Sequence, residues 1–451
     1  MAVGVPGLFR AAGRFCPLHR ILPALLLLPL FVLPAGDATA LDLETVQRQA
    51  QERSFSLKIA TADIALRRIE EEEALTGYLP TFALRYDLGY AWALDGQQGT
   101  VTIGDSVSAT DLSIWRNSLS ISASLLLYDG GARSQRLEQA RQGSRGAELT
   151  REDRRQELRL QVLDAYLEGL LSQYRVEILG KNVALHKQLF RELERLQQAG
   201  TVGQDRVQGV ALELAASLGR LDDARMARQR ALAKLTELTG EAYPETTTHL
   251  SELPAPQLNL ASELHVDQLP QIQAFDAELN RLHAARSAAW RELFPSIGLY
   301  GNYRWYGADP KGWNRALEDM SRRDATAAMV LQWQFAGFRD SLQVKRLDEQ
   351  LRRLRWQRKQ RVAELEREFG GLRQMAQHLP EYTEHLQMVR QADADAERLA
   401  RRLLEQGLLD APAELMRKIA RSERTLEAEE LRHRQLAEGL RLQIWQEGLK
   451  P

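Results

Sequence analysis

The sequence predicts a mainly α-helical chain with a small β part, and three observations support this fold class. Two stretches of 69 residues contain only one proline between them and predict very long helices. Two shorter runs alternate apolar and polar residues, which is the period of a β-strand. The same landmarks recur in both halves, since Gly130 and Gly337, and likewise Gly200 and Gly407, lie 207 residues apart. The chain is therefore expected to contain a structural repeat.

Residues 1–40 are expected to be a signal peptide. Three arginines precede the apolar run Ile21–Leu33, and Ala38-Thr39-Ala40 provides a small-x-small cleavage site. Two prolines interrupt the run, which is too short for a membrane-spanning helix. The only cysteine, Cys16, lies before the run. It therefore cannot be acylated at the cleavage site, and no disulfide is expected in the mature chain.

The first repeat is expected to cover 41–250 and the second 260–451, with a linker at 251–259. In the first repeat we expect a helix over 42–76, a β-hairpin over 79–129, a long helix over 131–199 and a helix over 204–239. In the second we expect a helix over 260–293, a β-hairpin over 294–336, a long helix over 338–406 and a helix over 411–447. Each long helix would measure about 104 Å. The two shorter helices of a repeat together match that length, so they are expected to lie end to end beside the long one.

The two hairpins are expected to meet a membrane. Five of the eight tryptophans lie within them, and aromatic girdles are typical of membrane β-barrels. The girdle candidates are Trp92, Trp115, Tyr303, Trp305 and Trp333. The alternative is an ordinary antiparallel sheet with one face on a core. No other segment reads as strand, however, so that face would be exposed to water.

Four strands cannot close a membrane barrel, because the smallest such barrels have about eight. Strand edges with unpaired backbone groups are costly in lipid, so several copies of the chain must join. Three copies would supply twelve strands and twelve helical columns, which match in number. Two or four copies remain open at this point.

Neither the composition nor the motifs indicate nucleic-acid binding, catalysis, or a cofactor or metal site. Lysine and arginine number 60 against 61 aspartate and glutamate, and this balance argues against nucleic-acid binding. The chain has no His-Glu-x-x-His zinc motif and no phosphate-binding Gly-x4-Gly-Lys-Ser/Thr run. His378 and His385 lie on a charged helix, where a solvated face is the simpler interpretation. We therefore expect no enzyme activity, no catalytic residue, no cofactor and no metal site.

The doubled order of these landmarks resembles the TolC-type outer-membrane efflux proteins over essentially the whole mature chain. The matching pairs are Leu79-Pro80 with Phe294-Pro295, Tyr128 and Gly130 with Phe335 and Gly337, and Arg195 and Gly200 with Arg402 and Gly407. The resemblance implies a homotrimer. Its 12-stranded β-barrel would lie in the lipid of the outer membrane of a Gram-negative cell and continue into a periplasmic α-helical barrel.

The resemblance further implies a passive exit duct for a tripartite efflux pump or a type I secretion system. Its partners would be a periplasmic adaptor protein and an inner-membrane transporter. The rival interpretation is a soluble periplasmic coiled-coil scaffold or adaptor without a pore, which explains the long helices but not the hairpins.

The residues at the turns after the long helices are the implied docking site for the adaptor. They are Ala199, Gly200, Thr201 and Val202 at the first tip, and Gln406, Gly407, Leu408 and Leu409 at the second. Simple helix capping by a glycine with positive φ is the structural alternative. The two interpretations are compatible.

The entrance of the duct is expected to be narrowed by charged residues. Family members often carry acidic residues about six and nine positions after the second tip glycine, but this chain has Ala413 and Met416 there. The candidates that remain are Asp205, Arg206, Asp410 and Glu414. We expect some of them to form a threefold charged ring or an Arg-carboxylate latch.

Overall fold

The computed structural model describes residues 40–92, 99–103, 106–110, 114–258, 265–333, 338–406 and 410–448. Apart from Ala40, the expected signal peptide lies outside these residues, as do Gly337 and the tip residues Gly407, Leu408 and Leu409. The described part is mostly helical and contains one four-stranded sheet and one two-stranded ribbon. The expected fold class, mainly α with a small β part, is confirmed.

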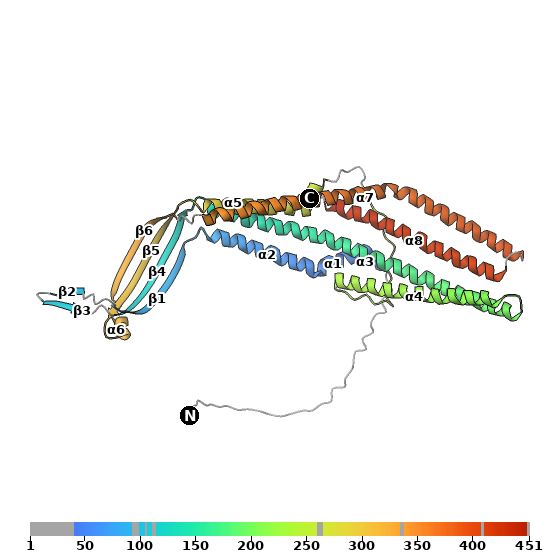
Figure 1. The fold of residues 1–451 in the computed structure, drawn as a ribbon, viewed down its shortest axis with the longest axis horizontal. Coiled ribbons are helices and arrows are strands. Elements are labelled where there is room, and N and C mark those ends of the chain that lie inside the picture. The colour runs from blue at the N-terminus through green and yellow to red at the C-terminus, as the bar shows by residue number, and fades with distance from the viewer. Residues whose placement is uncertain are drawn as a thin grey trace, which may run out of the picture. The chain divides into compact units, whose positions relative to one another are not determined.

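The elements follow one another in two similar series (Figure 1). The first series is α1 (Leu43–Arg53), α2 (Phe55–Thr76), β1 (Thr81–Ala91), β2 (Gly99–Ile103), β3 (Ser106–Thr110), β4 (Ile114–Tyr128), α3 (Ala132–Gln198) and α4 (Gln204–Thr239). The second is the 3-10 turn η1 (Val266–Gln268), α5 (Pro270–Arg291), β5 (Ser296–Asp309), α6 (Trp313–Glu318), β6 (Arg322–Gln332), α7 (Phe338–Glu405) and α8 (Ala411–Glu447).

The structure differs from the expected helix bounds at two places. The segment 42–76 is divided at Ser54, which has φ −54° and ψ 126° and caps both α1 and α2. The Ser54 hydroxyl forms a hydrogen bond with that of Ser56 at 2.8 Å rather than with the backbone. In the segment 260–293, α5 begins only at Pro270, after an extended Leu269. Proline restrains the preceding residue to extended conformations and is well suited to the first turn of a helix.

The links inside the hairpins also contain structure that the sequence did not reveal. The first link contains the antiparallel pair β2–β3, and the second contains the short helix α6.

The sheet is antiparallel with the strand order β1-β4-β5-β6. The two hairpins therefore join through β4 and β5, and β1 and β6 form the edges (Figure 1). A β-bulge between Leu126 and Tyr128 interrupts the ladder of β4 and β5 near the start of α3.

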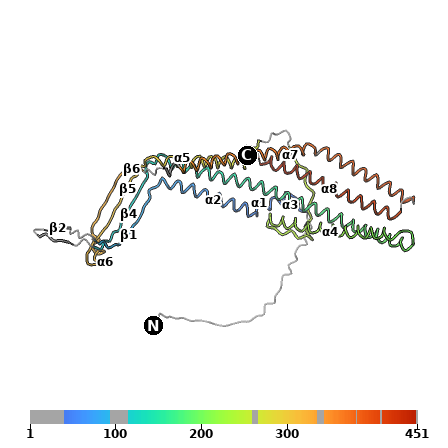
Figure 2. Tube along the Cα trace, viewed as in Figure 1, coloured from blue at the N-terminus to red at the C-terminus, as the bar shows by residue number. Residues whose placement is uncertain are grey.

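Shorter helices lie along successive parts of α3. α2 contacts α3 on the side of the sheet, and α4 contacts it towards the far end (Figure 2). α5 and α8 also pack on α3, while α7 packs on α5 and α8. The largest apolar cluster surrounds Leu163, Tyr166 and Leu170 of α3. Burial raises the pKa of the Tyr166 hydroxyl to about 12, and this group lies 2.7 Å from the carbonyl oxygen of Leu41 and 2.8 Å from that of Ser251.

Candidate functional site

The four-stranded sheet has two chemically different faces. Residues that pair directly across strands share a face, and the register aligns Tyr86 with Leu119 and Leu119 with Trp305. The face defined in this way is apolar, and away from the loop end, where α6 packs on β4 and β5, it is uncovered, since the side chains of Phe82 and Leu84 are 71% and 72% exposed. A contiguous exposed apolar surface indicates contact with a membrane or with another protein.

The opposite face of the sheet is polar. In β4 it carries Ser118, Ser120, Ser122 and Ser124. Nε of Arg85 donates to Oδ1 of Asp87 at 2.8 Å, and Nη2 of Arg304 donates to Oδ2 of Asp324 at 2.5 Å. Small hydroxyl groups and ion pairs are suited to contact with water. The sheet thus separates a water-compatible surface from an apolar one.

The five aromatic residues expected to form a girdle follow the register of the apolar face. At the loop end, the ring of Tyr90 lies 5.2 Å from that of Trp92 and 5.1 Å from that of Trp115 between centroids. The rings of Tyr303 and Trp305 are 4.5 Å apart. These four predicted residues therefore form two neighbouring clusters that share one surface.

Trp333 lies at the other end of the sheet. It directly follows β6, and its indole Nε1–H donates to the carbonyl oxygen of Leu293 at 3.0 Å, where α5 ends. The predicted aromatics thus mark both ends of the apolar face. Tryptophan is suited to such positions because its ring is apolar while its N–H needs a polar partner.

Asn117, which the sequence did not single out, lies on the apolar face and is 1% exposed. Its Oδ1 accepts a hydrogen bond from the Tyr86 hydroxyl at 3.1 Å, and its Nδ2 donates to the carbonyl oxygen of Trp313 at 3.0 Å. Asn117 thereby ties α6 to the sheet. The sequence signal for Asn117 was a polar residue at a position whose alternation places it on the same face as Leu119 and Ile121.

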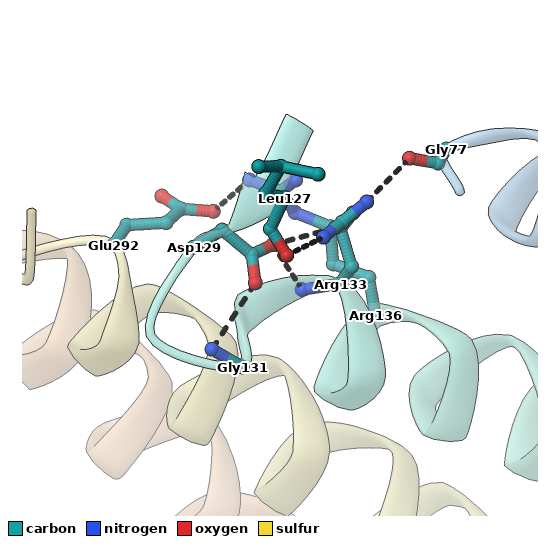
Figure 3. Close-up of polar contacts among 7 residues, drawn as sticks. All are labelled: Gly77, Leu127, Asp129, Gly131, Arg133, Arg136 and Glu292. Atoms are coloured by element: carbon teal, nitrogen blue, oxygen red, sulfur yellow. Dashed lines mark hydrogen bonds and ion pairs between the residues drawn. The ribbon is translucent and has the colours of Figure 1, made fainter. Parts of the chain in front are cut away.

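A partly buried ion pair joins the sheet to α3 (Figure 3). The Asp129 carboxylate accepts the backbone N–H groups of Gly131 and Arg133 at 3.1 and 2.8 Å, and also Nε of Arg133 at 3.2 Å. The guanidinium of Arg133 further donates to the carbonyl oxygens of Gly77 and Leu127 at 3.0 and 3.2 Å. The ends of α2 and β4 are therefore fixed to the first turn of α3.

The turn into α3 requires glycine. Gly130, the glycine of the Tyr128-x-Gly130 landmark, has φ 67°, and a Cβ atom there would lie 3.0 Å from both the carbonyl oxygen of Arg291 and Cβ of Phe294. Gly131 also has a positive φ, of 83°. Arg136, one turn further along, forms an ion pair with Glu292. The aromatic-x-Gly landmark of the first repeat thus has a steric cause. Its counterpart around Gly337 lies outside the described residues.

The first predicted tip is a glycine-capped turn between α3 and α4. Gly200 has φ 74°, and its N–H donates to the carbonyl oxygen of Gln197 at 2.9 Å. Both the N–H and the hydroxyl of Thr201 donate to the carbonyl oxygen of Leu196, at 3.0 and 2.9 Å. Ala199, Gly200 and Thr201 are exposed, whereas Val202 packs partly on the apolar cluster beneath the tip. The turn thus presents a small, ordered surface.

The second predicted tip is described only at its two sides. Gln406 is exposed at the end of α7. Asp410 caps α8, because its Oδ1 accepts the N–H of Ala413 at 2.9 Å. Glu414 pairs with Lys418 one turn later at 2.7 Å. These two gate candidates therefore have local partners within α8.

The other two gate candidates, Asp205 and Arg206, are exposed in the first turn of α4. Within the described residues, no hydrogen bond or ion pair connects them to Asp410 or Glu414. The single chain thus does not bring the four candidates together.

A ladder of ion pairs, also missed from the sequence, ties the far part of α7 to α8. Arg390 pairs with Glu429, Asp393 with Arg424 at 3.0 Å, and Glu397 with Arg421. Hydrogen bonds from Arg421 and from Arg401 lower the pKa of the Glu397 carboxyl below its ordinary value. The sequence could not reveal this ladder, because charged residues occur on all sides of both helices.

No helix in the described part of the chain combines the length and the apolar character needed to cross a bilayer. The described residues also contain no cluster of three side chains suited to hold a metal ion.

Comparison with known proteins relates these features to a family. The family model described as outer membrane efflux protein matches residues 46–241. No curated protein sequence matches the chain. The outer membrane protein VceC from Vibrio cholerae has a similar structure, with a TM-score of 0.70 at 15% identity over 90% of this chain and 95% of that one.

Two further solved structures share the fold. The CmeC outer membrane channel of Campylobacter jejuni has a TM-score of 0.71 at 13% identity and covers 90% of this chain and 89% of its own. The open state of the MtrE outer membrane channel of Neisseria gonorrhoeae has a TM-score of 0.62 at 18% identity and covers 90% and 88%. The family model thus matches residues 46–241, and the fold shared with these channels extends over both halves of the chain.

Proposed function

We propose that the protein is the passive outer-membrane exit duct of a tripartite efflux pump or a type I secretion system. The observation that carries this proposal is the sheet with one uncovered apolar face, bounded by aromatics, and one polar face. Such a sheet is suited to separate lipid from a water-filled passage. The 67 residues of α3 correspond to about 100 Å of helix, enough to extend far into the periplasm of a Gram-negative cell.

The duct would be a homotrimer. β1 and β6 each pair with only one strand within the described residues, and lipid does not tolerate open sheet edges. Pairing β6 of one copy with β1 of the next closes the sheet. Three copies then give the twelve strands that the family resemblance implies.

The duct would work with a periplasmic adaptor and an inner-membrane transporter. The chain itself has no motif for an energy source, so the driving force must come from a partner. The docking surface would be the two tips, Ala199–Val202 and Gln406–Leu409. The exposed, hydrogen-bonded turn at Gly200 supports this assignment. Passage through the duct needs no catalytic residue and no cofactor of the chain.

The entrance would be narrowed by charges at the starts of α4 and α8. Asp205 and Arg206 are the strongest candidates, because both are exposed and neither has an ion-pair partner among the described residues. Asp410 and Glu414 remain candidates, although the first also caps its helix and the second pairs with Lys418.

Conductance of the purified protein in planar lipid bilayers tests the proposal. We expect stable single-channel steps and a trimer in detergent that dissociates on heating. The substitutions Asp205→Asn and Glu414→Gln should alter conductance or cation preference, while Asp222→Asn, on an exposed surface of α4, should leave both unchanged. Extraction by buffer alone, without conductance, would instead identify a soluble scaffold.

Assays in cells separate the two kinds of duct. Deletion of the gene should raise sensitivity to toxic compounds if the duct serves efflux. It should abolish export of a protein substrate if the duct serves type I secretion. A strain unaffected in both assays would contradict the proposed role.

A further inference from the structure

The helix that leads into edge strand β1 has an uncovered apolar face. Leu57 and Ala60 of α2 are buried, but the face turned away from α3 is not covered. It carries Phe55, Ile59, Leu66 and Ile69, which are 74%, 58%, 59% and 52% exposed. These residues recur at helical spacing and form one stripe.

An acidic segment ends this stripe next to the sheet. Glu70 pairs with Arg67 at 2.8 Å, and Glu71 pairs with Arg141 at 3.4 Å. Glu72 and Glu73 are exposed, and neither has a cationic partner within 4.0 Å among the described residues. Two carboxylates are therefore left without counter-charges at the edge of the helical layer.

The helix that follows the other edge strand, β6, has the complementary character. Leu351 and Leu365 of α7 are buried on the side of α5. The opposite side carries Leu342 and Trp356, 61% and 64% exposed, and the exposed bases Lys345, Arg346 and Arg353. None of these three bases has a carboxylate within 4.0 Å in the described part of the chain.

The chain already contains a contact of the same kind. β4 pairs with β5, and α3, which follows β4, packs against α5, which precedes β5. In that contact a Cβ atom at Gly146 would lie 3.6 Å from Cβ of Ala277. Closure of the sheet through β6 and β1 places α7 and α2 in the same relation, with α2 coming from the next copy.

The offsets between the two repeats show which residues of α7 and α2 correspond to the residues that meet between α3 and α5. The long helices are offset by 207 residues, and the Leu79-Pro80 and Phe294-Pro295 landmarks by 215. Gly146 and Ala277 thus correspond to Arg353 of α7 and Ala62 of α2. Arg346 lies seven residues nearer the sheet than Arg353, about 10 Å along α7, and Glu73 lies eleven residues nearer than Ala62, about 16 Å along α2. The heights of Arg346 and Glu73 along the two helices therefore differ by about 6 Å. Lysine and arginine side chains span that distance.

We propose that α7 of one copy docks on α2 of the next copy, with Lys345 and Arg346 facing Glu72 and Glu73 and with Trp356 covering the apolar stripe beside Ile59. The inference rests on the self-association in the proposed function and names the helix surfaces that hold the copies in register. Charge complementarity fixes the partner, and the apolar stripe supplies the buried area.

Cross-linking tests the contact directly. The only cysteine of the sequence is Cys16, within the expected signal peptide, so introduced cysteines can be read cleanly. Ala62→Cys combined with Arg353→Cys should give dimer and trimer bands on a denaturing gel after treatment with a short bis-maleimide. The control, Arg225→Cys on α4 with Arg353→Cys, should give only monomer. Monomer alone from the first pair, in a protein that still runs as a native trimer and conducts, would overturn the contact but leave the proposed duct intact.

Charge reversal tests the pairing of the acidic and basic groups. The double variant Lys345→Glu and Arg346→Glu should lower the temperature of trimer dissociation by several degrees, and Glu72→Lys with Glu73→Lys should do the same. Combining all four should restore it. A matched reversal on α4, Asp222→Lys with Arg225→Glu, should have no effect. Additive losses in the fourfold variant would overturn the pairing, whereas the absence of any trimer from the unmodified protein would contradict the proposed function itself.

Discussion

Two pairs of antiparallel helices, α3 with α4 and α7 with α8, have nearly the same helix lengths. Different forces hold each pair together at the end that lies farthest from the sheet. Next to the first tip, Leu189 and Leu193 of α3 and Val207 and Val210 of α4 are buried in one apolar cluster. In α7, by contrast, none of the described side chains beyond Ala376 is buried. That part of α7 is tied to α8 by its ladder of three ion pairs.

This difference has a physical consequence for how firmly each end is held. Burial of apolar side chains contributes about 25 cal/mol per Å² and is not screened by salt. Exposed ion pairs contribute little and weaken as ionic strength or pH changes. The far end of α7 is therefore expected to separate from its neighbours more easily than α4 does, and the response of each hairpin to one substitution or to acid tests this view.

The largest effect is expected from a cavity beneath the first tip. Leu193→Ala removes a side chain that is 1% exposed, and such truncations cost about 2–5 kcal/mol. Hydrogen exchange should therefore accelerate along the far parts of α3 and α4. Leu212→Ala, at a position 73% exposed on α4, serves as the control and should change stability by no more than about 0.5 kcal/mol. Equal effects of the two variants would show that the apolar cluster is not what holds this hairpin.

A smaller effect is expected from removing one charge of the ladder. Glu397→Gln weakens two contacts of Glu397, those with Arg421 and Arg401. Exchange should accelerate in the far part of α7 but not in α4. Asp395→Asn is the matched control, because Asp395 pairs only within its own helix, with Arg398 at 3.3 Å. If both variants behave alike, the interhelical pair is not the relevant contact.

The smallest effect is expected from mild acid. The pKa of Glu397 in the folded chain is lowered from its ordinary value of 4.5, so the stability it contributes is fully present above pH 4.5 and is lost as pH falls through the lowered pKa. Between pH 7 and pH 5, the protection of α7, corrected for intrinsic exchange rates, should not change. Below pH 4.5 it should fall before that of α3 and α4. Loss of protection already near pH 6 would mean that another group controls this end.

Local sequence features predicted much of the fold. Helix bounds can be predicted where they depend on proline and on helix-breaking residues within a short segment. For this reason α4 and α8 cover the ranges 204–239 and 411–447 that were expected for them. Alternation of apolar and polar residues indicated strands for the same reason. At Ser54 and Pro270 the helix bounds differ from those expected, because the chain is extended at Ser54 and at Leu269.

The same distinction between local patterns and distant contacts applies to the residues of the candidate site. The sequence predicted a shared face for the five aromatic residues proposed for the girdle, because strand alternation determines which residues share a face. The helix α6 and its anchor Asn117 could not be identified, because the partner of that side chain is the carbonyl oxygen of Trp313, 196 residues away.

By itself, the sequence determined the order, type and approximate length of the elements, because these depend on periodicity and on glycine and proline within a few residues. Only the tertiary structure decided which charges meet, as in the contact of Arg175 with Glu430, 255 positions apart, at 2.6 Å. A helix rich in arginine and glutamate offers several equivalent partners on every side. Its rotation and height against the neighbouring helices, set by apolar packing, select among them.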